Sequence, residues 1–217
     1  MLALIFSNLV LFSVFSVLPL SSSERTGSSQ KPRYKSIKAK DILAELNLAR
    51  EHPRRYAEIL ENEKKYFRGN MLKRPGRIAL RTAEGVKAFD EAIRYLRKIK
   101  PCPPLRASKG MSRAARDHIS DQNRTGQFGH KGQDGSWPAD RISRYGTWER
   151  TMAENISYGS NTARDIIISL IVDDNVPDRG HRKNIFNSEF KVVGIGIGPH
   201  QKYRVMCVMD FAAGYIE

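Results

Sequence analysis

The chain has only two cysteines among its 217 residues, Cys102 and Cys207. A scaffold built on many disulfides is therefore excluded, and a hydrophobic core must stabilise the fold. In an oxidising compartment the two cysteines could form one bridge, which would close a long loop and add about 4 kcal/mol by the chain-entropy model. Two separate buried thiols are an equal alternative, because sequence spacing does not give the distance between the two residues.

Acidic residues are also scarce, and several signatures of enzymes are missing. The chain has 23 Asp and Glu against 37 Lys and Arg, a net charge of +14. Such a surface either serves solubility alone or attracts anionic lipid headgroups, acidic glycans or cell-wall polymers. Aromatic and basic residues do not interleave along a stripe, so we expect no nucleic-acid partner. The Gly-x-Ser-x-Gly and His-Glu-x-x-His motifs of hydrolases are absent, and neither cysteine lies in a turn typical of a catalytic nucleophile.

The first 23 residues contain no charged side chain. A nearly continuous apolar run, Leu2 to Leu20, is followed by three serines, which is typical of a secretory signal peptide. Basic residues follow the run but do not precede it, an order that also fits an uncleaved membrane anchor. We favour a cleaved signal peptide over residues 1–23, and therefore a secreted protein, with an anchor through residues 2–20 as the alternative.

The rest of the chain predicts one domain that starts with helices. Residues 24–40 are polar and basic, as expected of a solvated linker. A helix is predicted from Asp41, as its N-cap, to near Glu51, and Pro53 starts the next helix. Residues 61–103 are more charged and contain an amphipathic helix, predicted over 84–99.

The second half of the chain predicts further helices and then strands. Apolar spacing indicates a helix around 111–119, a short helix over 139–145, and a long helix capped by Asn161. Residues 191–198 and 203–211 are predicted strands, of which the second is apolar on both faces and therefore central. Glycines alternate along the first of these strands, which indicates close approach of another backbone. Helices followed by strands predict a layered α+β domain.

Two histidines and two acidic positions form a pattern that packing alone does not require. They are His130, Glu154, Asp173 or Asp174, and His181. Each lies where a helix or strand pattern breaks into a turn, and these side chains bind divalent metals and exchange protons near neutral pH. The spacing of the two aspartates predicts that both continue the buried stripe at a helix C-terminus, where a carboxylate needs a partner. His118, on a helical face, is predicted to be a core histidine with a hydrogen-bond partner.

Several short segments together resemble the CAP superfamily, also called the SCP domain. They are Asn47-Leu48-Ala49-Arg50, Phe128-Gly129-His130, Ala153-Glu154-Asn155-Ile156, Gly180-His181-Arg182-Lys183-Asn184-Ile185 and the two closing strands. The second histidine motif is more similar to the bacterial and protist branch than to animal venom proteins. The resemblance implies a three-layer α-β-α sandwich over 41–217 with a central cleft, and makes the charged region 61–103 an insertion.

The resemblance also implies which residues form the cleft. The family's tetrad of two histidines and two acids maps onto His130, Glu154, His181 and Asp173, with Asp174 as the competing acid. Asp173 stands where the family usually has Glu, so a shared ligand would lie closer to that helix. Two further candidates for the cleft are near Glu154 in sequence: Asn155 and Ser157.

Two functions follow as alternatives. In the favoured one, a secreted binding module takes a lipid or sterol, a glycan or a protein, and its tetrad can hold a divalent metal, Zn²⁺ first. The carboxylates would then act either as further ligands or as hydrogen-bond partners of the imidazoles. In the other, the same cleft serves a metal-dependent hydrolase of the protease or esterase kind.

Overall fold

The computed structural model describes residues 37–77 and 79–217. The predicted signal peptide or anchor, residues 1–23, and most of the predicted linker lie outside the described residues. The last residues of that linker are not irregular, because helix α1 (Ala39–Glu51) already begins within it. In the ranges that the structure describes, no helix is both long enough and apolar enough to span a membrane.

A four-stranded sheet forms the centre of the domain. Its order is β4 (Arg106–Ala107), β6 (Val192–His200), β7 (Arg204–Ile216) and β5 (Thr147–Tyr158). The pair β4–β6 is parallel, whereas β6–β7 and β5–β7 are antiparallel. Strand β7 is hydrogen-bonded on both sides and buried over most of its length, which confirms the predicted central strand.

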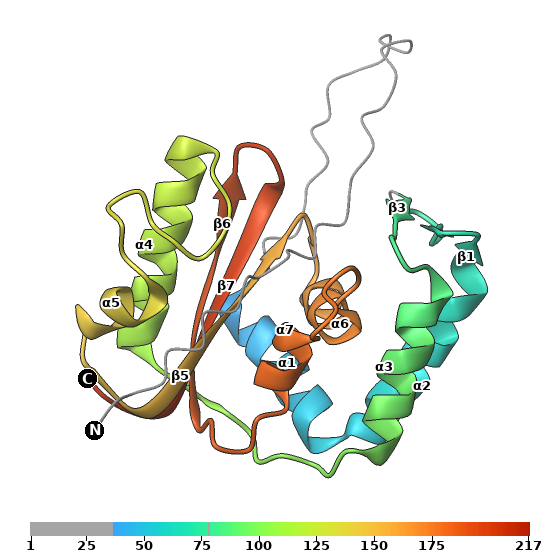
Figure 1. Ribbon diagram of the computed structural model, residues 1–217, viewed down its shortest axis with the longest axis horizontal. Coiled ribbons are helices and arrows are strands. Elements are labelled where there is room, and N and C mark those ends of the chain that lie inside the picture. Colours follow the sequence, from blue (N-terminus) through green and yellow to red (C-terminus); the bar gives the residue numbers. More distant parts are fainter. Residues whose placement is uncertain (1–36, 78) are drawn as a thin grey trace, which may run out of the picture.

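Helices cover both faces of this sheet (Figure 1). On one face lie α4 (Lys109–Thr125) and α5 (Pro138–Ser143). On the other lie α1, α6 (Ala163–Val172) and α7 (Gly180–Ile185). The predicted α-β-α sandwich is therefore confirmed.

Two strand glycines allow α4 to approach the sheet closely. A Cβ atom at Gly194 would lie 2.3 Å from the backbone carbon of Met111, and one at Gly196 would lie 3.0 Å from that of Ala115. The first distance is shorter than a side chain tolerates, so glycine is required at Gly194, and the second leaves little room for one at Gly196. The predicted close approach of a second backbone is confirmed.

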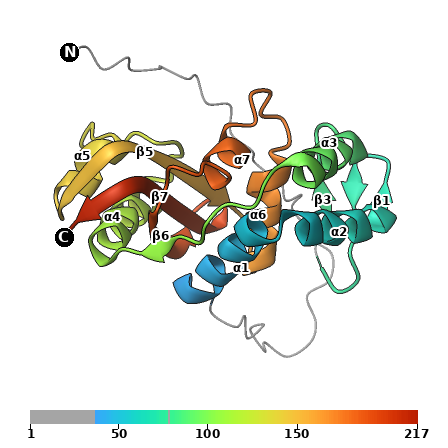
Figure 2. The ribbon, with the colours of Figure 1, turned by 90° about the horizontal axis from the view of Figure 1, so that it is seen from below.

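The charged region between α1 and the sheet forms a lobe beside the sandwich. Helix α2 (Pro53–Glu63) is followed by a short 3-10 helix (Lys64–Tyr66), a small antiparallel sheet and α3 (Val86–Lys98). That sheet consists of β1 (Phe67–Arg68), β2 (Met71–Leu72) and β3 (Leu80–Arg81). Figure 2 shows α2 and α3 side by side, beyond α1 and α6. Buried side chains of the lobe share one core with α6, including Leu60, Phe89 and Leu96.

The predicted N-caps of two helices and the predicted helical placement of two aspartates are wrong. Lys38, not Asp41, precedes α1, and Thr162, not Asn161, caps α6 by accepting the N–H of Asp165. Helix α6 ends at Val172, so neither aspartate continues its stripe: Asp173 has φ 57°, in the left-handed region.

Buried polar groups of α1 fix the segment between α3 and the sheet. Arg50 is fully buried and donates to the carbonyls of Pro103, Ile185 and Asn187. Asn47 exchanges two hydrogen bonds with the backbone of Leu105. These bonds satisfy a charge that burial would otherwise make costly.

Both cysteines are free thiols, so the predicted alternative of one bridge is not realised. Cys102 is buried and its thiol donates to the carbonyl of Phe186 at 3.2 Å. Cys207 is buried in β7, where burial raises the pKa of its thiol well above the usual value.

Candidate functional site

His130 lies on the loop between α4 and α5, and its neighbour Gly129 fixes the loop. Gly129 has φ 108°, a conformation that a side chain disfavours. Its N–H donates to the hydroxyl of Tyr158 at 2.9 Å, and its carbonyl lies 2.8 Å from Nε2 of His118. His118 is buried in α4 as predicted, and burial lowers its pKa. The neutral ring therefore holds the loop that carries His130.

A buried carboxylate on β5 holds the ring of His130. Nδ1 of His130 lies 2.6 Å from Oε1 of Glu154, whose side chain is 1 % exposed. The second oxygen, Oε2, accepts from Arg141 of α5 at 2.7 Å. Arg141 also donates to the carbonyl of His130, so one buried guanidinium binds both members of the pair.

The charge of Glu154 is maintained despite its burial. Burial alone would raise its pKa, but the hydrogen bond with His130 and the positive charge of Arg141 outweigh that effect and lower the pKa to about 2. An ionised carboxylate accepts a hydrogen bond from Nδ1–H, so a neutral His130 carries its lone pair on Nε2.

His181 and Asp173 form a second pair of the same kind, in which a carboxylate oxygen holds Nδ1 of the imidazole. Nδ1 of His181 lies 2.6 Å from Oδ1 of Asp173, and Oδ2 accepts the backbone N–H of His181 at 3.0 Å. Asp173 is fully buried at the C-terminus of α6, and its left-handed conformation turns the carboxylate towards α7. In the described part of the chain, Nε2 of His181 has no hydrogen-bond partner.

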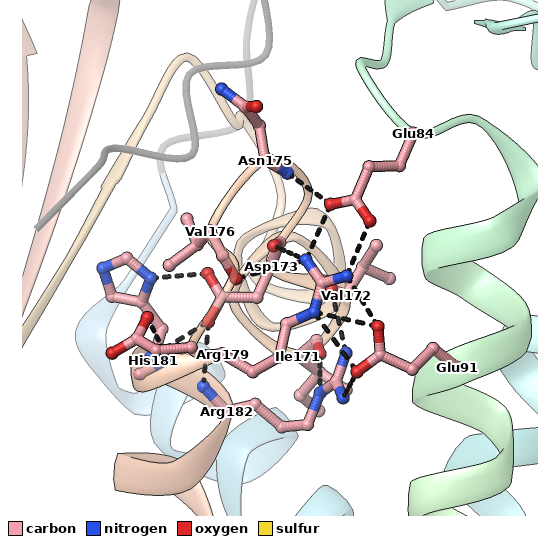
Figure 3. Close-up of polar contacts among 12 residues, drawn as sticks. Glu84, Glu91, Ile171, Val172, Asp173, Asn175, Val176, Arg179, His181 and Arg182 are labelled. Carbon is pink, nitrogen blue, oxygen red and sulfur yellow. Dashed lines mark hydrogen bonds and ion pairs between the residues drawn. The ribbon is translucent and has the colours of Figure 1, made fainter.

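A network of arginines and glutamates ties this second pair to the lobe (Figure 3). Arg179, with φ 53°, donates to the carbonyl of Asp173 at 2.6 Å. Its guanidinium also binds Glu84 at 2.7 Å and Glu91 at 2.6 Å, both from the α3 region. Arg182 of α7 binds Glu91 at 2.9 Å from the other side. The lobe is therefore attached to both ends of the segment that carries Asp173 and His181.

Both imidazoles line one cavity of about 190 Å³. The other lining residues are Glu154, Val176, Asp178, Gly180, Lys183 and Asn184. Four side chains from three separate segments of the chain thus converge here, three of them on the cavity wall and Asp173 directly behind His181. The cavity offers two imidazoles whose Nδ1 atoms are already engaged by carboxylates.

Two other candidates, Asp174 and Asn155, have different roles. Asp174 faces the lobe, where its carboxylate accepts the N–H groups of Ala83 and Glu84 at 2.7 and 2.9 Å, so its assignment to the cleft is corrected. Asn155 is fully buried, donates to the carbonyl of His181 at 3.0 Å and accepts from Asn184. It braces the wall of the cavity.

Ser157 is buried in β5, with its Oγ 3.3 Å from that of Ser169. It is not among the residues that line the cavity.

Sequence reasoning missed two buried members of the site, Arg141 and Asp210. Asp210 of β7 lies opposite Glu154 in the β5–β7 pair and is 1 % exposed. Burial raises its pKa well above the usual value, and the negative charge of Glu154 adds to the effect. Burial and the neighbouring charge therefore both favour the protonated form of Asp210. Neither residue lies in a turn, and no local pattern marks an arginine or a strand aspartate as a partner of Glu154.

The donor set fits a metal only in part. Within residues 37–77 and 79–217, no group of three or more His, Cys, Asp or Glu side chains is arranged to hold a metal ion. The two carboxylates bind Nδ1 of the histidines, an arrangement that orients imidazoles for a metal at Nε2. Two imidazoles fall short of the four ligands of a structural zinc site, so water or a bound ligand would have to supply the others.

Comparison with known proteins finds a family match over more than half of the chain. Residues 91–211 match the family model described as CAP, the cysteine-rich secretory protein family. An uncharacterized protein, YkwD, of Bacillus subtilis (strain 168) is 29% identical over 115 residues, which make up 51% of this chain and 43% of that protein. The chain thus matches less than half of that relative's length.

Two solved structures are also similar. An outer surface protein from Borrelia burgdorferi is 16% identical, with a TM-score of 0.43 over 50% of this chain and 76% of that one. An extracellular protein containing a SCP domain from Bacillus anthracis str. Ames is 22% identical, with a TM-score of 0.41 over 58% of this chain and 39% of that one.

Proposed function

Because the chain belongs to the cysteine-rich secretory protein family, we propose that it is a secreted binding protein whose cavity holds a divalent cation between His130 and His181. One observation carries this proposal: two imidazoles, each bound at Nδ1 by a buried carboxylate, line the same cavity. Packing alone gives no reason to bury two carboxylates beside two histidines, because each costs desolvation.

Zn²⁺ is the cation that this donor set suits best, because neutral imidazole is one of its preferred ligands. When bound, the cation supplies a Lewis acid that polarises a further ligand. The residues of the chain do the remaining work. Glu154 and Asp173 fix the tautomer and orientation of the two rings, and Arg141 keeps Glu154 ionised.

The size of the cavity favours an ion with a small polar ligand over a sterol. Pockets for drug-sized ligands measure about 300–1,000 Å³ and are mostly apolar. The tetrad cavity measures about 190 Å³, and Val176 is the one large apolar side chain on its wall. A second cavity of about 390 Å³, beside Arg141 and His118, is lined by charged and polar side chains apart from Gly132. Neither cavity suits a lipid tail.

Calorimetric titration of Zn²⁺ into the purified protein tests the proposal. We expect binding near one equivalent in the wild type and its loss in the His130→Ala, His181→Ala double variant. His52→Ala is the matched control, because His52 is exposed and is not among the residues that line the cavity. Equal heats in the wild type and the double variant would refute the metal site.

A metal-dependent hydrolase remains the alternative function of the same cavity. The His130–Glu154 pair has the form of a base with an orienting carboxylate, which is the observation in its favour. Incubation with generic peptide and ester substrates, with Zn²⁺ or with chelator, distinguishes the two. We expect no turnover in either condition, whereas turnover that chelator abolishes would establish the enzyme.

A further inference from the structure

The positive charge of the chain is concentrated in one part of the fold. Residues 53–106 comprise the lobe of α2, α3 and the small sheet, the segment after α3, and Arg106 at the start of β4. They carry 15 Lys and Arg against six Asp and Glu. Their net charge is +9, whereas the other described residues together carry +2. The sandwich is thus nearly neutral, and the lobe accounts for most of the charge.

Nearly all acidic side chains of the lobe are already neutralised. Glu61 and Asp90 bind Lys64, and Glu63 binds Arg74. Glu84 and Glu91 bind the arginines beside His181. Of the six acids, Glu58 alone has no ion-pair partner among the residues that the structure describes.

The basic side chains of the lobe are mostly unpaired. Eleven of them are exposed, and in the described part of the chain none has an acidic side chain within ion-pair distance. They are Arg54, Arg55, Lys65, Arg68, Lys73, Arg81, Lys87, Arg94, Lys98, Lys100 and Arg106. Eleven unpaired cations against one unpaired anion make a surface that attracts a polyanion at long range.

Helix α3 orders part of this charge into a stripe. Lys87, Arg94 and Lys98 are separated by seven and four residues, which places them on one face of the helix. Lys100 follows at its C-terminal end. The face is rigid relative to the tetrad cavity, because α3 shares the main core with α6 and binds Arg179 and Arg182.

Among its described residues, the lobe exposes many charged side chains and no large hydrophobic one. The exposed large hydrophobic side chains of the described residues are Phe128, Trp137 and Ile216, all outside the lobe. A partner would therefore lie against the lobe without insertion of side chains into it. Residues 21–36, which follow the apolar run Leu2 to Leu20, carry four more basic residues and one acid. Clusters of exposed basic residues are typical of contact with anionic lipid headgroups.

We propose that the basic lobe, residues 53–106, docks the protein on an anionic lipid surface through the exposed face of α3. Attraction of this kind falls with ionic strength, since exposed charges are screened over about 8 Å at physiological salt. Each basic side chain near such a surface contributes roughly a fivefold factor to the partition coefficient. Removal of three should therefore weaken binding on the order of a hundredfold.

Co-sedimentation of the full chain with vesicles tests this surface. One set of vesicles is phosphatidylcholine alone, and the other is phosphatidylcholine mixed with phosphatidylglycerol. The readout is the difference between the two sets, because any contribution of the apolar run Leu2 to Leu20 is common to both. We expect the difference to disappear at high salt and to be lost in the Lys87→Gln, Arg94→Gln, Lys98→Gln variant.

The matched control removes three exposed basic side chains from the sandwich: Arg116→Gln, Lys191→Gln, Lys202→Gln. Thermal unfolding confirms that both triple variants fold. Equal weakening by the two triples would overturn the proposal, as would equal binding to both kinds of vesicle. Binding of soluble polyphosphate that needs the α3 residues, without binding to anionic vesicles, would also overturn it in favour of a polyanionic polymer. The His130→Ala, His181→Ala variant should bind vesicles like the wild type, so this test is independent of the metal site.

Discussion

Asp210 lies directly opposite Glu154 across the β5–β7 strand pair, and both carboxyl groups are almost completely buried. The surroundings lower the pKa of Glu154 and raise that of Asp210. Glu154 remains ionised beside His130 and Arg141, whereas burial and the charge of Glu154 favour the protonated form of Asp210. Opposite shifts of this kind are how two close carboxyl groups coexist in a protein interior.

Replacement of Asp210 by Asn should stabilise the protein at neutral pH. The unfolded chain ionises Asp210 above a pKa of about 3.9, while the native state keeps its proton. The native state then binds more protons than the unfolded state, so this residue costs stability as the pH rises. Asn keeps a donor for Glu154 and does not titrate. We expect a gain of more than about 1 kcal/mol at pH 7 and almost none below pH 4.

Chemical denaturation at several pH values measures this effect. Glu189→Gln, at an exposed residue without an ion-pair partner in the described chain, is the control and should change little at any pH. A loss of stability in Asp210→Asn at pH 7 would show that Asp210 is ionised in the native state.

Removal of the carboxylates that hold the histidines should weaken Zn²⁺ binding. In Glu154→Gln and Asp173→Asn an amide replaces the acceptor at 2.6 Å from each Nδ1, so the rings lose their fixed tautomer. Loss of such partners typically lowers metal affinity about 10- to 100-fold. Calorimetric titration checks the affinity. The matched control is Asp174→Asn, which changes the neighbouring acid that faces the lobe.

The arginine network should couple the lobe to the segment of His181. Glu91→Gln leaves Arg179 with Glu84 alone and removes the acidic partner of the buried Arg182. We expect a loss of about 1 to 2 kcal/mol in unfolding free energy, below the cost at a fully buried pair, because Glu91 is 39 % exposed. Glu58→Gln on the same lobe should have no effect.

Acid should remove the effect of Glu91→Gln. Hydrogen bonds from Arg179 lower the pKa of Glu84 and of Glu91. Their contribution is therefore complete above the unfolded pKa of about 4.3 and is lost as the pH falls through the lower folded values. Thermal unfolding of wild type and variant should converge at low pH, and a constant difference would contradict this origin.

The loss of stability caused by alanine at each strand glycine should depend on which atoms the new Cβ contacts. Gly194→Ala places a Cβ against the backbone of Met111, which cannot move without shifting α4, so we expect a loss of about 2 to 3 kcal/mol. At Gly196 the nearest atom is the flexible end of Ile119, at 2.8 Å, and the loss should be smaller. Denaturation of both variants gives the order, and the reverse order would contradict the packing of α4 on β6.

The sequence predicted the layers because periodic apolar positions report burial directly. It also predicted that His130, Glu154 and His181 share one cleft, because the turns and the family motifs that contain these residues can be recognised in short stretches of sequence. The family resemblance preferred Asp173 to Asp174, but the reason that separates them is tertiary. The carboxylate of Asp173 faces α7, whereas that of Asp174 accepts the N–H of Glu84 before the start of α3. The burial of Arg50 could not be predicted from the sequence, because its partners are carbonyls more than fifty residues away.

The central claim is that His130 and His181 act together in one cavity. Nitrogen-15 spectra of histidine-labelled protein, titrated with Zn²⁺, test it directly. We predict that the Nε2 resonances of His130 and His181 shift together up to one equivalent, while those of His52, His118 and His200 do not. A shift of one ring without the other, or of His52 first, would contradict the account.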